Sequence, residues 1–209
     1  MSVLISYKYN FIFIHVYKVA CSSIEHVLEK YTFRPYESVT AKVLQKLSLL
    51  PRSSDFDIHI TAKDLRNKLG SNRFNRFFKF AFVRNPWDWQ VSLYTYMLKN
   101  EKHPQHSLIK SMSSFEEYIE WRVNTDKHLQ KEFVTDETGN IMVDFVGKYE
   151  NLQSDFNKIC VRLAISESLP HLNVSKVRDY REYYTDKTKN LIFEHFKDDL
   201  ELFSYSWPE

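Results

Sequence analysis

The segment Asn10-Phe11-Ile12-Phe13-Ile14-His15-Val16-Tyr17-Lys18-Val19-Ala20-Cys21-Ser22-Ser23 contains the order of elements that decides the fold. Residues 10–16 are almost continuously apolar, which is typical of a strand buried on both faces. Ser22 and Glu25 have the spacing of a capping box, and apolar residues then recur at helical intervals. We therefore expect a strand, a short basic loop and a helix.

The same arrangement recurs later in the chain. Phe78–Val83 predicts a second buried strand, Arg84-Asn85 a turn, and Pro86 the first position of a helix that runs to about Lys99. Strands followed by helices imply a mainly parallel sheet with helices on its faces. We expect a three-layer α/β fold and, because no linker divides the chain, a single domain over residues 1–209.

Weaker signals predict further elements. They are a cap at Thr61 with a short helix that ends near Gly70, a helix over Ser114–Val123, and a hairpin over Phe133–Phe145. Helical stripes occur at Leu152, Phe156, Ile159, Cys160 and Leu163, and again at Leu191, Ile192, Phe196 and Leu200. Because Cys160 lies on the first stripe, we expect it to be a core residue.

The composition excludes several classes of protein. Three glycines, Gly70, Gly139 and Gly147, are too far apart to form a dinucleotide-binding or Walker-type glycine motif. Two cysteines, neither in a C-x-x-C pair, encode no disulfide framework and no zinc site of known spacing. No apolar run has the length of a membrane span, and the basic residues near the N-terminus do not fit a signal peptide. We expect a cytoplasmic protein.

The charge is distributed unevenly along the chain. Residues 1–100 hold 15 Lys and Arg against 7 Asp and Glu, whereas residues 101–209 hold 14 against 20. The basic half favours an anionic ligand. Open α/β sheets bind ligands at the carboxyl ends of their strands, and both predicted strand ends carry a cation there, Lys18 and Arg84. Small residues follow Lys18 and Ser92 follows Arg84, so a ligand with two separate phosphates fits both ends.

These two segments resemble the motifs of a known family. Phe11–Ser23 resembles the 5′-phosphosulfate loop of sulfotransferases that use 3′-phosphoadenosine 5′-phosphosulfate (PAPS), and Phe80–Asp88 with Ser92 resembles their 3′-phosphate motif. The carbohydrate and bacterial branch, sulfotransferase family 2, is the most similar group. Its members also tend to carry stretches like His59–Ala62, Tyr149–Leu152, His171 with Asn173, and the pair Tyr183-Tyr184.

The resemblance implies a P-loop-like fold and transfer of a sulfuryl group from PAPS to a hydroxyl, with PAP as product, no metal, and a saccharide or glycoconjugate as acceptor. It implies that Lys18, Val19, Ala20, Cys21, Ser22 and Ser23 bind the 5′-phosphosulfate, with Lys18 also stabilising the leaving group. Arg84 and Ser92 would bind the 3′-phosphate, and a later segment with Ser175, Lys176 and Tyr180 would close over the cofactor. Tyr17 and Trp89 depart from the family pattern, which usually has proline and arginine there.

The acceptor hydroxyl needs a general base, and histidine is the first candidate near neutral pH. His59 is the leading candidate, because it lies between the two phosphate motifs and related enzymes use a histidine in a broadly similar place. Glu25 and His15 remain alternatives. Two other functions also remain open: a nucleotide-dependent phosphotransferase, and a module that binds RNA or another polyanion through the basic half. The leading hypothesis, a sulfotransferase, involves no nucleic acid and no membrane span. The sequence carries no signal for an oligomeric state.

Overall fold

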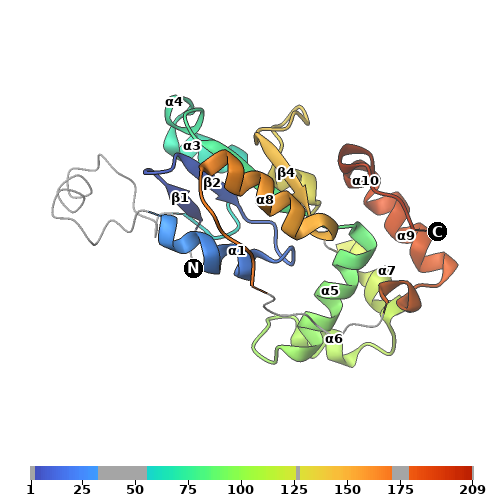
Figure 1. The fold of residues 1–209 in the computed structure, drawn as a ribbon. Helices are drawn as coiled ribbons and strands as arrows, with labels where there is room; N and C mark the ends of the chain where they lie inside the picture. Colours follow the sequence, from blue (N-terminus) through green and yellow to red (C-terminus); the bar gives the residue numbers. More distant parts are fainter. Residues whose placement is uncertain (1–2, 33–55, 126–127, 171–178, 209) are drawn as a thin grey trace. The chain divides into compact units, whose positions relative to one another are not determined.

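The computed structural model describes residues 3–32, 56–125, 128–170 and 179–208 (Figure 1). The chain divides into two compact units. Unit 1 comprises Met1–Val83 and Glu132–Leu172, and unit 2 comprises Arg84–Lys131 and Asn173–Glu209. The single domain expected over residues 1–209 stays a prediction.

Unit 1 is built on a four-stranded sheet in the order β1-β2-β3-β4. Its strands are β1 (Leu4–Ser6), β2 (Phe11–Ile14), β3 (Phe78–Val83) and β4 (Phe145–Lys148). β1 pairs antiparallel with β2, whereas β2, β3 and β4 are parallel, with Ile14 opposite Ala81 and Val83 opposite Lys148. The expected α/β class with a mainly parallel sheet is therefore confirmed.

The two central strands are buried because nearly all of their side chains are apolar. Every residue of β2 has no exposed surface, and Phe80–Val83 of β3 are equally buried. The rings of Phe13 and Phe80 stack across the two strands with centroids 5.2 Å apart. This pairing of apolar strands, fully removed from water on both faces, forms the core of unit 1.

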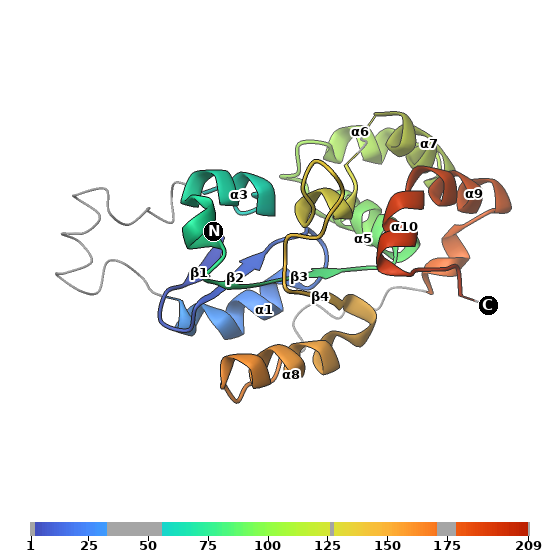
Figure 2. The ribbon, with the colours of Figure 1, turned by 90° about the horizontal axis from the view of Figure 1, so that it is seen from above.

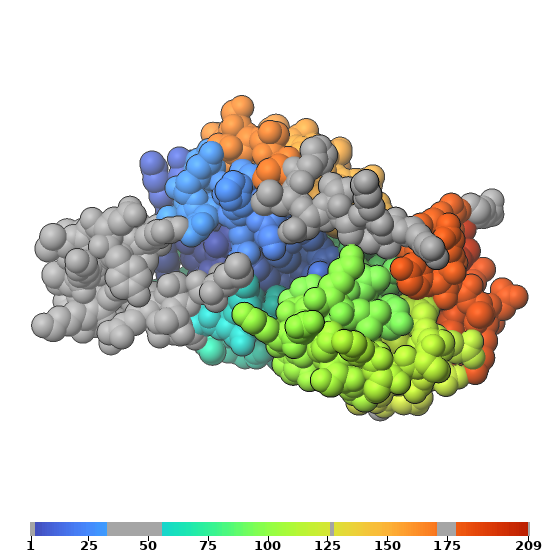
Figure 3. Space-filling view, turned by 90° about the horizontal axis from the view of Figure 1, so that it is seen from below, coloured from blue at the N-terminus to red at the C-terminus, as the bar shows by residue number. Residues whose placement is uncertain are grey.

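Helices cover both faces of this sheet, with α3 on one face and α1 and α8 on the other (Figure 2). The helices of unit 1 are α1 (Cys21–Leu28), α3 (Ala62–Leu69), α4 (Ser71–Phe74) and α8 (Leu152–Leu163), with the 3-10 turns η1 (Glu29–Tyr31) and η4 (Tyr149–Asn151). The blue atoms of α1 lie beside the orange atoms of α8 in the space-filling view (Figure 3). A hydrogen bond from the Tyr31 hydroxyl to Glu167 joins the segments that follow these two helices.

Unit 2 consists of helices in the described residues. They are α5 (Pro86–Lys99), α6 (His106–Ser111), α7 (Phe115–Thr125), α9 (Asp186–His195) and α10 (Lys197–Phe203), with the 3-10 turn η5 (Tyr180–Tyr183). α5 packs against α6, α7, α9 and η5. The short 3-10 turn η3 (Gln130–Phe133) lies where the chain passes from unit 2 back to unit 1.

Most of the expected helices are confirmed, but several local expectations are wrong. Thr61 caps α3, as expected. Only one bridge, Thr135 with Ile141, forms within the expected hairpin, and Phe145 instead begins the parallel strand β4. The last apolar stripe belongs to two helices, α9 and α10, which meet at Phe196. Cys160 is buried in α8, as expected.

Gly147 leaves room for a core ring. It pairs with Phe82 in the β3–β4 ladder, and a Cβ atom at Gly147 would lie 2.5 Å from a carbon of the buried Phe82 ring. We expect Gly147→Ala to lower the free energy of unfolding by about 1–3 kcal/mol through overpacking. Urea denaturation of a double-mutant cycle with Phe82→Leu tests the cause. The second substitution should recover part of the loss, and strictly additive effects would contradict the steric explanation.

Candidate active site

The loop between β2 and α1 contains two strained residues. Lys18 and Ala20 both adopt the left-handed conformation, with φ of 66°. For residues other than glycine this conformation costs on the order of 1–2 kcal/mol each. Such strain persists only where the surroundings hold the backbone, and it concentrates at functional sites. The buried residues Val16 and Val19 provide that hold, because they anchor both sides of Lys18 in the core.

The N-terminus of α1 carries no side-chain cap. Its N-cap residue is Ala20, whose carbonyl accepts from the Ser23 and Ile24 amides at 3.0 and 3.2 Å, and the first turn has no acidic residue. The expected capping box at Ser22 and Glu25 is therefore wrong. The helix begins at Cys21 with Ala20 as its N-cap, two residues earlier than that motif requires. The backbone amides and the helix dipole at this end favour an anion.

The Cys21 thiol stabilises the loop and is not a nucleophile. Its Sγ donates to the Val16 carbonyl at 2.9 Å, which ties the first residue of α1 to the second residue after β2. Burial raises the pKa of this thiol to about 12. The thiolate is therefore not populated at neutral pH.

A cluster of ionisable groups surrounds the end of β2. The His15 ring has no exposed surface, and neither of its nitrogens has a hydrogen-bond partner. Its Nδ1 lies 3.7 Å from Oε1 of Glu25, which is on α1. Burial, and then repulsion from His59, lower the pKa of His15 to about 3, while burial raises the pKa of Glu25. His15 is therefore neutral at physiological pH.

His59 approaches the same strand end from a turn. The Ile60 amide donates to the Asp57 carbonyl and the His59 amide to the Asp57 side chain, which fixes this turn just before α3. The ring of His59 is exposed, and its Nδ1 lies 3.3 Å from the His15 carbonyl oxygen. When Nδ1 donates to that carbonyl, Nε2 keeps its lone pair and can accept a proton. The Tyr17 ring contacts the His59 ring edge-to-face at 5.9 Å.

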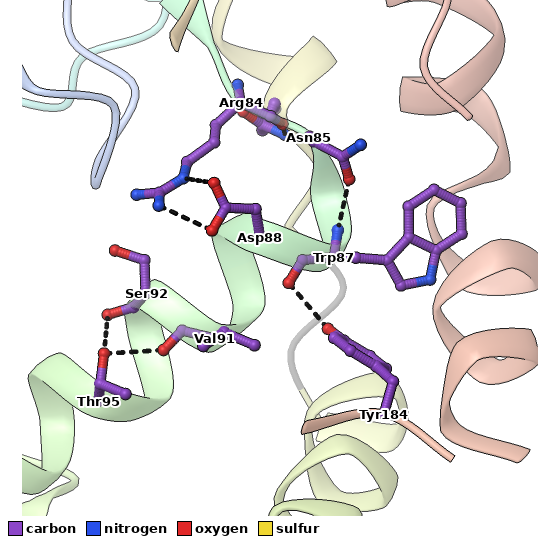
Figure 4. Close-up of polar contacts among 9 residues, drawn as sticks. Arg84, Asn85, Trp87, Asp88, Val91, Ser92, Thr95 and Tyr184 are labelled. Carbon is purple, nitrogen blue, oxygen red and sulfur yellow. Dashed lines mark hydrogen bonds and ion pairs between the residues drawn. The ribbon is translucent and has the colours of Figure 1, made fainter. Parts of the chain in front are cut away.

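The second predicted motif forms a turn in unit 2 (Figure 4). Asn85 caps α5: its Oδ1 accepts from the Trp87 amide at 3.1 Å, and its Nδ2 donates to the Ser206 carbonyl at 3.1 Å. Pro86 occupies the first helical turn, as expected. The Trp87 carbonyl accepts from the Tyr184 hydroxyl at 2.9 Å. Segments from the C-terminal part of the chain therefore hold this turn.

The backbone of Arg84 is clamped by a buried amide. Gln130 accepts from the Arg84 amide at 2.9 Å and donates to the Arg84 carbonyl at 2.8 Å. Asp199 holds Gln130 and the next residue in turn, because its carboxylate accepts from their backbone amides at 2.8 Å each. Gln130 and Asp199 have no exposed surface. Sequence reasoning missed both residues, because these contacts join distant segments without a motif.

The Arg84 side chain forms an ion pair with a residue that the motif analysis gave no role. Its Nε and Nη2 donate to the two oxygens of the Asp88 carboxylate at 2.6 and 2.8 Å (Figure 4). Ser92, one helical turn further, lies on the same side of α5. The spacing of Arg84 and Asp88, four residues apart, is the signal that would have indicated this pair from the sequence.

Trp89, which departs from the family pattern, is a core residue. It is buried, as is Trp87, and it packs against Phe196 edge-to-face and under the guanidinium of Arg122.

The remaining predicted site residues belong to the segment expected to close over the cofactor. Tyr180 begins η5, with its ring 6.0 Å from that of Trp207. Ser175 and Lys176 lie outside the described residues.

Comparison with known proteins decides the family. The model of the sulfotransferase family matches residues 1–206. This chain belongs to the sulfotransferase family. It is 24% identical to carbohydrate sulfotransferase 14 of Mus musculus and of Homo sapiens over 178 residues, which cover 75% of this chain but only 45% of each relative.

This member of the sulfotransferase family is also similar to a protein whose name gives no function. An uncharacterized protein of Archaeoglobus fulgidus is 31% identical over 121 residues, which cover 56% of this chain and 94% of that protein. No solved structure matches. In the described ranges, the helices are all too short or too polar to cross a bilayer, and no group of three or more His, Cys, Asp or Glu side chains is arranged to hold a metal.

The buried neutral His15 predicts an acid-sensitive fold. Its pKa is about 3 in the folded protein against 6.5 in the unfolded chain. The folded state is therefore not penalised by His15 above pH 6.5, and the free energy of unfolding falls below that pH as the unfolded chain takes up the proton. We expect the wild type to lose about 1 kcal/mol more than His15→Phe between pH 7.5 and pH 5.5, measured by urea denaturation. The raised pKa of Glu25 acts in the opposite direction at lower pH. His26→Gln, at an exposed histidine, is the control and should behave as the wild type. Parallel pH curves for wild type and His15→Phe would refute the assignment.

Proposed function

We propose that this protein transfers a sulfuryl group from PAPS to a hydroxyl group of a carbohydrate acceptor. The observation that carries the proposal is the match of the sulfotransferase family model to residues 1–206. The geometry of the two loops supports it, because each has features that suit one of the two phosphate-containing ends of PAPS. The carbohydrate acceptor rests on the names of the two relatives, of which this chain spans less than half.

The loop from Lys18 to Ser23 is our proposed site for the 5′-phosphosulfate. The start of α1 lacks both a side-chain cap and an acidic residue, so its amides suit an anion. Lys18 and Ala20 are left-handed, whereas Val19 between them is not. Such an alternation of left-handed and other residues in a loop after a buried strand is a backbone pattern known to form anion-binding concavities. Lys18 adds the positive charge that such a ligand requires.

The segment after β3 is our proposed site for the 3′-phosphate, and it differs from the first loop. The N-terminus of α5 is capped by Asn85, begins with Pro86 and carries Asp88 in its first turn, so its amides do not suit an anion. We therefore assign this phosphate to the side chains of Arg84 and Ser92. Tyr180, together with Ser175 and Lys176, completes the proposed cofactor site. Because β2 and β3 are neighbours and parallel, the two loops start at the same edge of the sheet.

The chain's own residues would supply charge stabilisation and proton transfer. When bound, PAPS provides the sulfuryl group, whose sulfur gains a bond to the acceptor oxygen and loses its bond to the bridging phosphate oxygen. Lys18 would donate to that bridging oxygen, which becomes negative. Nε2 of His59 would accept the proton of the acceptor hydroxyl, with Nδ1 held by the His15 carbonyl. Glu25 is the alternative base, since burial raises the pKa of its carboxyl. No residue of the described chain is assigned to a metal in this reaction.

A ligand panel tests the proposed cofactor. Thermal unfolding is measured with adenosine 3′,5′-bisphosphate (PAP), adenosine 5′-monophosphate (AMP), ATP with Mg²⁺, and a single-stranded oligonucleotide. We expect PAP to raise Tm by several degrees in the presence of EDTA, because a ligand at about 100 times its Kd adds roughly 2.7 kcal/mol of stability. A larger shift with ATP and Mg²⁺ would favour a phosphotransferase, and one with the oligonucleotide a polyanion-binding module.

Substitution of Lys18 tests its catalytic role. We expect Lys18→Ala to lower the turnover number by about a hundredfold or more, the scale of losing one preorganised donor to a developing negative charge. Lys8→Ala is the matched control, because it removes the same charge from an exposed position in the same basic half. Sulfuryl transfer from PAPS to a saccharide panel gives the readout. Full activity in Lys18→Ala, with the control also active, would overturn the assignment.

A further inference from the structure

The proposed 3′-phosphate site contains a carboxylate whose presence needs an explanation. Asp88 and Ser92 are four residues apart on α5, Arg84 lies just before the helix and reaches Asp88 with its side chain, and Figure 4 shows the three side chains on the same side of the helix. Asp88 therefore stands between the two side chains that we assign to the phosphate. Its negative charge alone would weaken phosphate binding by repulsion.

The contact geometry points to a compensating effect. Asp88 accepts from both Nε and Nη2 of Arg84, at 2.6 and 2.8 Å, and the two side chains are only 11% and 16% exposed. A two-point bond of this kind fixes the plane of the guanidinium as well as its position. A guanidinium has five N–H donors, so two bonds to Asp88 do not exhaust its capacity to donate.

The backbone of Arg84 is already fixed, so only its side-chain torsions could still vary. Gln130 binds both the amide and the carbonyl of Arg84, at 2.9 and 2.8 Å. An arginine side chain otherwise samples many rotamers, and immobilising it on ligand binding costs conformational entropy. The ion pair with Asp88 removes that freedom before the ligand arrives, which is the general basis of preorganisation.

We infer that Asp88 is a positioning residue, which holds the Arg84 guanidinium beside Ser92 in the orientation that binds the 3′-phosphate of the nucleotide. The inference rests on the proposed function. It assigns Asp88 more than the ordinary role of an acidic residue in the first turn of a helix, which would affect the stability of α5 but not the recognition of one phosphate.

The test isolates the contribution of the 3′-phosphate. Isothermal titration calorimetry gives Kd for PAP and for AMP, which lacks that phosphate, and the ratio of the two constants measures 3′-phosphate recognition. We expect Asp88→Ala to reduce the preference for PAP by about tenfold, the scale of losing one orienting charge-assisted interaction, and to leave the Kd of AMP nearly unchanged. Asp88→Glu should retain most of the preference. Glu201→Ala is the charge-matched control, because it removes an exposed carboxylate that pairs with Lys197 at 3.9 Å on α10.

A second comparison separates positioning from stability. In an Arg84→Ala background, Asp88→Ala should change the PAP preference no further, since the group that it positions is absent. If Asp88→Ala does not fold, the isosteric Asp88→Asn replaces it, and we expect a reduced preference there as well. An unchanged or increased preference in the folded Asp88 variant would overturn this inference alone. A wild-type protein that binds PAP no better than AMP would overturn the proposed function, and the inference with it.

Discussion

The parallel pairing of β2 with β3 is the constraint on which the candidate site depends. Both strands are apolar and almost fully buried, so their backbone groups can be satisfied only by each other and by the flanking strands. With Ile14 opposite Ala81, the two strands run out at the same edge of the sheet. A basic residue follows each strand, Lys18 after β2 and Arg84 directly after β3, and neither segment alone would indicate a ligand with two phosphates.

The two strand–loop–helix segments differ in how their helix N-termini are capped and charged. α1 begins at Cys21 with no side-chain cap and no acid, after a loop in which Lys18 and Ala20 are left-handed. α5 begins with an asparagine cap and a proline and has Asp88 in its first turn. The first end therefore offers backbone amides to an anion, whereas the second offers only side chains. Under our proposal, the side chain of Arg84 takes the place of such amides, and Gln130 and Asp88 hold its backbone and its guanidinium.

The parts of the fold that the sequence predicted are those with strong local signals. The apolar runs of β2 and β3 and the Asn85-Pro86 start of α5 were sufficient for the class of fold. β1 was missed because it has three residues, and β4 because its four residues include Gly147 and are mostly half-buried. The capping box at Ser22 failed because the left-handed Ala20 starts the helix earlier. Asp88 was readable from its spacing to Arg84, whereas the contacts of Gln130 with Arg84 and Asp199 join segments whose meeting depends on tertiary packing.

The cluster around His15 bears on the choice of the general base among the three candidates. His15 is completely buried and neutral, so its ring cannot meet an acceptor. Glu25 is nearly buried beside it, and its carboxyl lies 3.7 Å from the His15 ring. Of these three, His59 is exposed and its Nδ1 lies 3.3 Å from the His15 carbonyl oxygen, which supports our proposal that its Nε2 accepts the proton.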